Sequence, residues 1–597
     1  MTVSLDVGSL SAAYAQGTLS PADIITEVYD RIAAQGEQPV WISLVPREQA
    51  SAKALSAPRG PLYGIPFAIK DNIDAAGLAT TCACPEFAYM PQRSATVVER
   101  LEAAGAILIG KTNMDQFATG LVGVRSPYGI PHSVFSSAYV SGGSSSGSAV
   151  AVASGLVSFA LGTDTAGSGR VPAAFNNIVG LKPTKGLIST RGVVPACRSQ
   201  DVVSIFALTV GDAGTVANVA AAFDAEDDYS RSPSHPITAE TLKPDLRLGI
   251  PHDGLEFFGN KDTEQLYRDA VARMAGLGAT AVPIDFAPFR DAARLLYSGP
   301  WVAERLAAIG KFAKAQPQAL HEVVRGIILG AETISAASAF EGFYTLAKLI
   351  RACESEWQKM DVMLLPTAPA IYKIADVLAD PVQLNSNLGL YTNFVNLMDL
   401  SALAVPAGFG RDGLPFGVTL IGRAFEDGRL AAIGDALHRT LTAALLGATQ
   451  TPLAGTPPIR ISISAQKTIA VAVVGAHLTG QPLHWQLTER AATFVKTART
   501  ASGYSFYALA NTSPAKPGLV FDGAGQGNIE VEIWQMSEAA FGSFVALIPA
   551  PLGIGTLQLS DGETVKGFLC EAHAATNAQD ITGFGGWRAW LSAKAAS

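Results

Sequence analysis

The sequence predicts an α/β fold for most of its 597 residues, because short apolar segments alternate with segments of helical pattern. Ala104–Gly110 and Ser158–Gly162 are apolar and glycine-bounded, as buried strands are. Ala95–Ala104 and Gly428–Thr442 have the pattern of helices. Strands that are apolar throughout are buried on both faces, so we expect a central sheet covered by helices on each side.

A helix near the N-terminus is well marked. Ser20 suits the N-cap position, Pro21 suits the first helical position, and Asp23 lies in the first turn. Apolar residues such as Ile24 and Val28 then recur at helical spacing.

A domain boundary is predicted at Thr449–Pro458, which holds three prolines and follows the last helical segment. Strand patterns resume at Ile469–Gly475, Ser505–Leu509 and Ile529–Trp534. We therefore expect a first domain over residues 1–455, a linker over 456–465 and a smaller α+β domain over 466–597.

Composition excludes several classes of function. The net charge is -8, and no run of Lys or Arg suggests a nucleic-acid or lipid-headgroup partner. Ser133–Thr163 carries no charge but is rich in Ser and Gly, so we expect no membrane span. The five cysteines lack metal-ligand spacing, and the N-terminus has no signal-peptide pattern. These features predict a reduced, cytoplasmic protein without a metal.

Three segments carry candidate chemistry: Gly64–Asn72 (GIPFAIKDN), Ser141–Ser148 (SGGSSSGS) and Gly162–Arg170 (GTDTAGSGR). A Ser/Gly run alone is most often a flexible loop, and a Lys after an apolar run is most often a strand-end charge. Together the three segments resemble the amidase signature family. The similarity continues through Lys111–Phe117 and Val405–Gly417 and covers about the first three quarters of the chain.

This resemblance implies a mixed central sheet and a Lys–Ser–Ser catalytic triad. Ser168 would be the nucleophile, Ser144 the proton relay after a cis peptide bond, and Lys70 the base. A lysine acts as a base only when neutral, and burial among apolar neighbours favours the neutral amine. The backbone N–H groups of the nucleophile loop would form the oxyanion hole, at Thr165, Ala166, Gly167 and Ser168.

The nucleophile loop departs from the family pattern at one position, since Ala166 stands where a glycine is usual. Alanine is small, so we expect the tight loop to persist. Asp164 and Arg170 are expected to brace the loop rather than react. A Ser-His-Asp hydrolase is the rival type, but no GxSxG elbow is present, and only His132 lies near the serine segments in sequence.

Selectivity is predicted from Leu295–Arg305, which resembles a segment of the allophanate hydrolases within the family. By that resemblance Tyr297 and Arg305 bind the substrate carboxylate, a task that suits the planar guanidinium. The alternative is a structural role, in which both residues lie on one helix and pair with acidic residues at the surface. Phe117–Gly129 also resembles this subgroup.

The C-terminal segments Val474–Trp485 and Ile548–Thr556 resemble the accessory domain of allophanate hydrolases. The beginning of this domain also resembles the γ-glutamylcyclotransferase fold, but Phe541–Leu559 contains no Glu to serve as that fold's acid. We single out His477 as a candidate proton donor for decarboxylation; a structural histidine is the alternative.

The resemblance implies hydrolysis of allophanate to ammonia and N-carboxycarbamate, which then loses carbon dioxide. No cofactor is expected. The expected partners are the small substrate, a second copy in a homodimer, and a separate urea carboxylase in the pathway. Alternatives are a component of a glutamine amidotransferase, a malonamate- or biuret-type amidase, and a non-catalytic scaffold.

Overall fold

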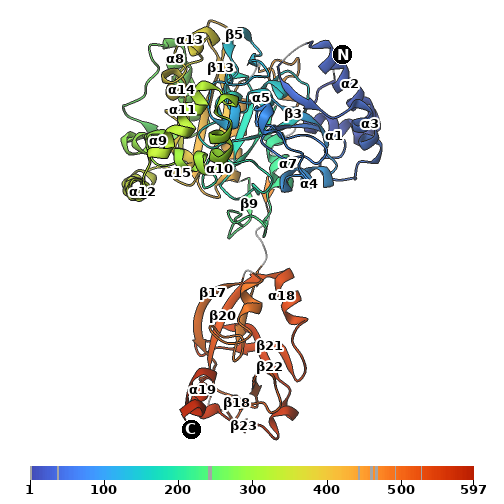
Figure 1. Ribbon diagram of the computed structural model, residues 1–597, viewed down its shortest axis with the longest axis vertical. Helices are drawn as coiled ribbons and strands as arrows, with labels where there is room; N and C mark the ends of the chain where they lie inside the picture. The colour runs from blue at the N-terminus through green and yellow to red at the C-terminus, as the bar shows by residue number, and fades with distance from the viewer. Residues whose placement is uncertain are drawn as a thin grey trace. The chain divides into compact units, whose positions relative to one another are not determined.

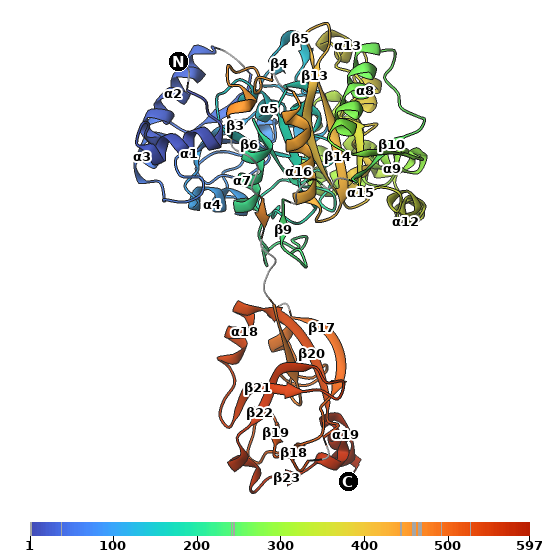
Figure 2. The same ribbon diagram turned by 180° about the vertical axis from the view of Figure 1, so that it is seen from behind.

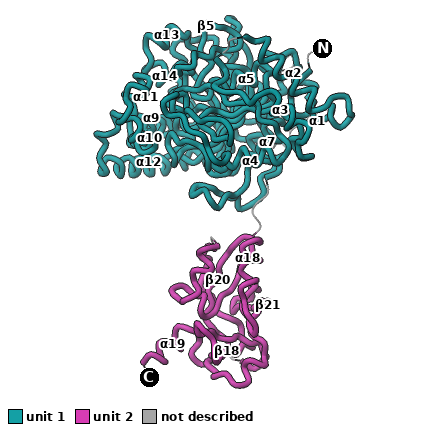
Figure 3. Tube along the Cα trace, turned by 45° about the vertical axis from the view of Figure 1, so that its right-hand side comes forward, with its two compact units in different colours: residues 1–465 teal, residues 466–597 magenta. Residues whose placement is uncertain are grey.

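The computed structural model describes residues 3–36, 39–239, 242, 245–441, 444–456, 461–463, 468–490, 492–525 and 527–596. The chain separates into two compact units, residues 1–465 and 466–597, coloured separately in Figure 3. The expected linker 456–465 lies partly outside the described residues. Ser462–Ile463 (β15) pairs with Ile237–Thr238 (β9), so this strand belongs to the first unit.

An 11-stranded mixed sheet forms the centre of the first unit (Figure 1). Both of its ends contain parallel pairs, whereas the strands between them are antiparallel. Across the sheet the strands are β1 (Trp41–Leu44), β3 (Ile107–Thr112), β2 (Pro66–Lys70), β6 (Phe159–Thr163), β8 (Val203–Ala207), β7 (Val179–Lys182), β13 (Leu400–Phe409), β14 (Pro415–Arg423), β12 (Val362–Pro366), β10 (Arg247–Pro251) and β11 (Thr280–Ile284).

Helices cover both faces of this sheet (Figures 1 and 2). Leu403 of β13 packs against Gly434, whereas Gly417 of β14, the partner of Pro406, packs against Ala174. Because successive residues of a strand face opposite sides, the helices that carry Gly434 and Ala174 cover opposite faces. The helices of the first unit are α1 (Val7–Gln16), α2 (Pro21–Ala34), α3 (Arg47–Ser56), α4 (Thr96–Ala103), α5 (Ser146–Ala153), α6 (Val171–Phe175), α7 (Val210–Ala220), α8 (Lys261–Gly276), α9 (Ala287–Ser298), α10 (Val302–Ala315), α11 (Glu322–Gly330), α12 (Ala336–Trp357), α13 (Ile374–Ala379), α14 (Gln383–Leu388), α15 (Phe394–Leu397) and α16 (Asp427–Arg439).

The α/β prediction is confirmed, and several elements lie where the sequence placed them. Helix α2 begins with a capping box between Ser20 and Asp23. The predicted helix Gly428–Thr442 is α16, which ends at Arg439; position 442 lies outside the described residues. The apolar segments beginning at Ala104 and Ser158 form β3 and β6.

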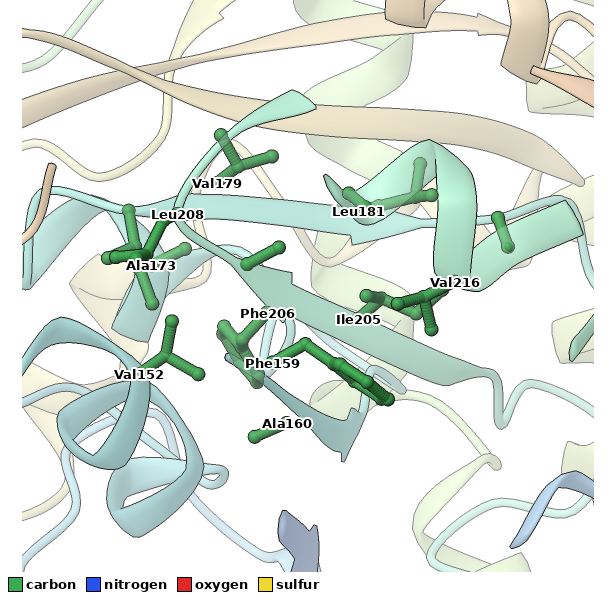
Figure 4. Close-up of a cluster of buried hydrophobic side chains, with 14 of the residues drawn as sticks. Val152, Phe159, Ala160, Ala173, Val179, Leu181, Ile205, Phe206, Leu208 and Val216 are labelled. Carbon is green, nitrogen blue, oxygen red and sulfur yellow. The ribbon is translucent and has the colours of Figure 1, made fainter. Parts of the chain in front are cut away.

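Buried apolar side chains of β6, β7 and β8 form part of the core of the first unit (Figure 4). Phe206 faces Gly162 and the α5 side, and Ile205 lies beside Val216 of α7 on the other side. The stacked rings of Phe67 and Phe159, with centroids 5.2 Å apart, join β2 to β6. Burying each such side chain contributes about 1.5–3 kcal/mol, which fixes the strands whose ends carry the site.

The second unit is sheet-rich and has its own apolar core. Within the described chain, five strands form its larger sheet and three its smaller one. The larger sheet is β17 (Thr493–Arg499), β20 (Glu530–Ser537), β16 (Thr468–Val473), β22 (Thr564–Cys570) and β21 (Leu552–Gln558); the smaller is β19 (Pro517–Phe521), β18 (Tyr504–Ala508) and β23 (Gln579–Asp580); the helices are α17 (Trp485–Thr488), α18 (Glu538–Val545) and α19 (Trp587–Ala596).

No single helix among the described residues has both the length and the apolar composition to cross a membrane. Glu322–Thr333 and Ala336–Trp357 meet those criteria only as a pair, bent by 102°.

Candidate active site

Lys70, Ser144 and Ser168 meet at one edge of the central sheet. Lys70 ends β2, Ser144 precedes α5, and Ser168 lies in the loop between β6 and α6. Strands β2 and β6 are parallel neighbours, so their carboxyl ends bring Lys70 and the nucleophile loop to the same edge. The Lys70 Nζ donates to the Ser144 Oγ at 2.7 Å, and the Ser144 Oγ donates to the Ser168 Oγ at 2.9 Å.

The environment of Lys70 favours the neutral amine. Its side chain is fully buried, and its hydrogen-bond partners are the hydroxyls of Ser144 and Thr163, the latter at 2.8 Å. Burial is the main cause that lowers the pKa of Lys70 to about 7, although Asp115, Asp201 and Asp164 act in the opposite direction. A large share of Lys70 is therefore unprotonated at neutral pH and able to accept a proton.

The relay serine is held by a tightly packed turn. The Gly143–Ser144 peptide bond is cis, as the resemblance predicted. Gly143 donates its N–H to the Leu121 carbonyl at 2.8 Å, and the Ser144 carbonyl accepts from the Asp115 N–H at 3.0 Å. A Cβ on Gly143 would lie 2.1 Å from the Asp115 Oδ2, so this position requires glycine.

The nucleophile loop presents free backbone donors. Among the hydrogen bonds of the described residues, none is donated by the N–H of Thr165, Ala166, Gly167 or Ser168. Unpaired N–H groups beside a buried serine are what an oxyanion hole requires, so the loop agrees with the predicted role of these residues. The alanine at 166 is accommodated, since it is 2% exposed within an intact loop.

A buried ion pair braces this loop from within. The Arg170 Nε and Nη2 donate to the two oxygens of Asp164 at 2.8 and 3.0 Å, and both side chains are fully buried. The Asn396 Nδ2 donates to the Asp164 carbonyl at 2.7 Å and to the Thr165 carbonyl at 3.1 Å. These side-chain contacts fix the loop, while its N–H groups at 165–168 keep no partner among the described residues.

Tyr297 and Arg305 lie on different helices, α9 and α10, and meet in the interior. The Arg305 Nη2 donates to the Tyr297 hydroxyl at 3.2 Å, and the Nη1 donates to the Thr119 Oγ1 at 2.8 Å. Arg305 is 2% exposed, and its Nε has no partner among the described residues. The alternative of a single surface helix paired with acids is therefore wrong.

His477 lies in the second unit within an aromatic cluster. Its ring stacks on Phe568 at 5.0 Å between centroids and meets Phe544 edge-on at 5.2 Å. The His477 Nε2 is 2.9 Å from the Gln486 Oε1. Burial lowers the pKa of His477, so its imidazole is neutral at neutral pH.

Sequence reasoning missed three supports of the first unit's site. Thr163 lies within one of the three motifs, but nothing in the motif marks it as a partner of Lys70. Asn396 and Asp201 brace the nucleophile loop through the Thr165 carbonyl and hydroxyl respectively. They come from distant segments, and no local pattern signals them. Within the described residues, no group of three or more His, Cys, Asp or Glu side chains could hold a metal.

Comparisons with known proteins assign the family. The Amidase family matches residues 23–431, more than half of the chain, and the allophanate hydrolase C-terminal domain matches residues 469–592. The chain belongs to the amidase family. The first unit is thus the amidase unit.

Among solved structures, this amidase is similar to the Kluyveromyces lactis allophanate hydrolase, with 43% identity, 99% of both chains covered and a TM-score of 0.73. Urea amidolyase of Saccharomyces cerevisiae is 45% identical over 92% of this chain, but the match covers only 31% of that protein. The chain thus spans about a third of that curated relative. A glutamyl-tRNA(Gln) amidotransferase chain of Symbiobacterium thermophilum is 36% identical over 73% of this chain and 96% of its own length.

Proposed function

We propose that this amidase hydrolyses allophanate, and that Ser168 forms the acyl-enzyme. The observation that carries the proposal is the hydrogen-bonded series of Lys70, Ser144 and Ser168 beside unpaired backbone donors. For the relay the two hydroxyl hydrogens turn, so that Ser168 donates to Ser144 and Ser144 donates to neutral Lys70, which then accepts the proton. A hydroxyl can donate and accept at once, so Ser144 suits this relay.

The first half-reaction releases ammonia. The Ser168 Oγ attacks the terminal amide carbon, and the oxyanion that forms accepts hydrogen bonds from the loop N–H groups. The proton held by Lys70 passes back through Ser144 to the leaving nitrogen, and the carbon–nitrogen bond breaks. In related sites, one oxyanion donor contributes about 3–4 kcal/mol to the transition state.

Water completes the reaction by the same relay. It loses a proton through Ser144 to Lys70, attacks the acyl carbon and expels the Ser168 oxygen, which regains a proton. The product is N-carboxycarbamate, which loses carbon dioxide and then breaks down to a second ammonia and carbon dioxide.

Selectivity for a carboxylated amide is assigned to Tyr297 and Arg305. Arg305 is buried, and its guanidinium is bonded to hydroxyls and a carbonyl rather than to a carboxylate. A substrate carboxylate would supply the negative charge that the hydroxyls and the carbonyl around Arg305 lack.

For the second unit we propose a role in the decarboxylation, with His477 as its candidate residue. A neutral imidazole has one N–H, which His477 directs at the Gln486 Oε1, and in this proposal that N–H turns to the substrate nitrogen as negative charge develops there. The proposal extends to a cytoplasmic homodimer that receives its substrate from a separate urea carboxylase. All five cysteines are unbonded and buried, which supports a reducing compartment.

The test is ammonia release from allophanate, malonamate, biuret and glutamine by the purified chain, compared side by side. We expect allophanate to give the highest kcat/KM, and Ser168→Ala to abolish turnover while its circular dichroism is unchanged. Preference for glutamine would favour the amidotransferase-like alternative, to which the relative with 36% identity gives some weight. Turnover of none of the four would sink the proposal.

A further inference from the structure

A cavity of about 630 Å³ lies against Tyr297 and against Leu121, a residue that contacts the turn before Ser144. Leu121 forms part of its wall, and the Leu121 carbonyl accepts the N–H of Gly143, next to Ser144. Asn385 lines the cavity as well and fixes Leu121 by accepting its N–H at 2.8 Å. Cavities of this size hold ligands much larger than a small amide, so there is room outside the reacting centre.

The lining of this cavity is cationic. It includes Arg125, Arg290 and Arg294, and none of its lining residues is an Asp or Glu. Arg125 is buried and donates to the carbonyls of Thr119 and Pro381, which are neutral acceptors. Its charge therefore has no carboxylate bonded to it.

Two of these arginines, one turn apart on α9, differ in their pairing. The Arg294 Nη1 lies 3.0 Å from the Asp291 Oδ1, and both side chains are exposed. The Arg290 Nε is buried without a hydrogen-bond partner, and no ion pair between described residues includes Arg290. Among the described residues, Arg290 thus has no carboxylate paired with it, whereas Arg294 is paired with Asp291.

We infer that the cavity is an anion-binding vestibule, which draws carboxylate-bearing amides toward Tyr297 and in which Arg290 is the recognising charge. A guanidinium pairs well with a carboxylate, and like charges in a low-dielectric wall raise the local concentration of anions. The inference rests on the proposed function for its substrate class. Arg290 is a specificity-determining residue here and takes no part in bond making.

The experiment compares Arg290→Gln with the matched control Arg294→Gln. Malonate, a small dicarboxylate, serves as the binding probe in calorimetry, and kcat/KM is measured for malonamate and for neutral propionamide at low and high salt. We expect Arg290→Gln to weaken malonate binding and lower kcat/KM for malonamate about three- to tenfold at low salt, with a shallower salt dependence. Arg294→Gln should change either value less than twofold.

Arg290→Lys keeps the charge and should retain most of the malonate affinity, which separates a charge effect from misfolding. Equal effects of the two Gln variants, no effect of either, or an equal loss on propionamide would overturn the vestibule. An enzyme that binds malonate through Arg290 but releases no ammonia from allophanate would overturn the proposed function and leave the vestibule standing.

Discussion

Lys70 ends β2, Lys111 is the next-to-last residue of the neighbouring β3, and both are fully buried, yet they differ in what balances their charge. The Lys111 Nζ lies 3.1 Å from the Asp71 Oδ1, so a carboxylate compensates it. The Lys70 Nζ donates to the hydroxyls of Ser144 and Thr163, and no carboxylate among the described residues forms an ion pair with it. The same residue type is a structural cation on one strand and a candidate base on the next, because burial without a carboxylate destabilises the charged form.

This difference predicts the pH dependence of catalysis. Since the pKa of Lys70 is lowered to about 7 and only the neutral amine accepts a proton, kcat/KM should rise with pH and level off above about 7. The measurement is a kcat/KM profile for a substrate that does not titrate between pH 5 and 9. Lys70→Met should remove the rise of kcat/KM with pH, along with most of the activity. A profile that is flat from pH 5 would contradict this role of Lys70.

Arg305 is expected to act on anionic substrates. Arg305→Ala removes a charge-assisted contact of about 1.5–3 kcal/mol per hydrogen bond, so kcat/KM for allophanate should fall at least tenfold, chiefly through KM. Propionamide should be affected much less. Tyr297→Phe is the milder companion, since it removes only the hydroxyl that accepts from Arg305. Equal losses on both substrates would show that Arg305 only supports the fold.

At the scale of elements, the site depends on a short loop between a strand and a helix. In the loop from β6 to α6, four N–H groups have no partner among the described residues, and the ion pair of Asp164 and Arg170 lies within the same loop. Gly167 packs so closely that an added Cβ would lie 2.4 Å from the Thr392 hydroxyl. Side chains thus hold the loop in place, because its N–H groups at 165–168, the predicted oxyanion hole, make no hydrogen bonds among the described residues that could do so.

Breaking this brace should cost both stability and activity. Arg170→Gln leaves the buried Asp164 carboxylate without its partner, a change that typically lowers the free energy of unfolding by about 3–5 kcal/mol. Urea denaturation followed by tryptophan fluorescence measures the loss, and kcat should fall as the loop loosens. Arg351→Gln, which breaks an exposed pair with Glu354, is the control and should cost less than about 1 kcal/mol. Equal denaturation midpoints for the two variants would refute the bracing role.

At the scale of the whole molecule, two units with separate cores divide the chain. Strand β15 at Ser462–Ile463 pairs with β9, so the amidase unit keeps its strands only if it extends past the expected boundary at 455. The second unit buries its own cluster around Val471 and Trp587.

The division predicts separable reactions. A chain that ends at Ala465 should fold and release the first ammonia at the wild-type rate but accumulate N-carboxycarbamate. Carbon-13 NMR of labelled allophanate follows both steps, and full-length His477→Ala should show the same accumulation. If the truncated and full-length enzymes give the same product time course, the second unit has no part in decarboxylation.

The sequence by itself determined the chemistry-bearing residues and the local elements. The motifs that hold Lys70, Ser144 and Ser168 are found along the chain by their resemblance to the amidase signature, and the cap at Ser20 is a contact between near neighbours. Such features depend on residues close in sequence, where periodicity and turn chemistry act directly.

Only the tertiary structure decided which residues, distant in sequence, brace the site and which charged side chains lie near it. Asn396 reaches the loop of Ser168 from another segment, one helix ends and the next begins between Tyr297 and Arg305, and the buried Arg290 Nε has no partner among the described residues. No local pattern specifies the order of strands in a sheet or the distances across a core. These follow from the packing of the whole chain, because burial and charge compensation depend on every segment that surrounds a residue.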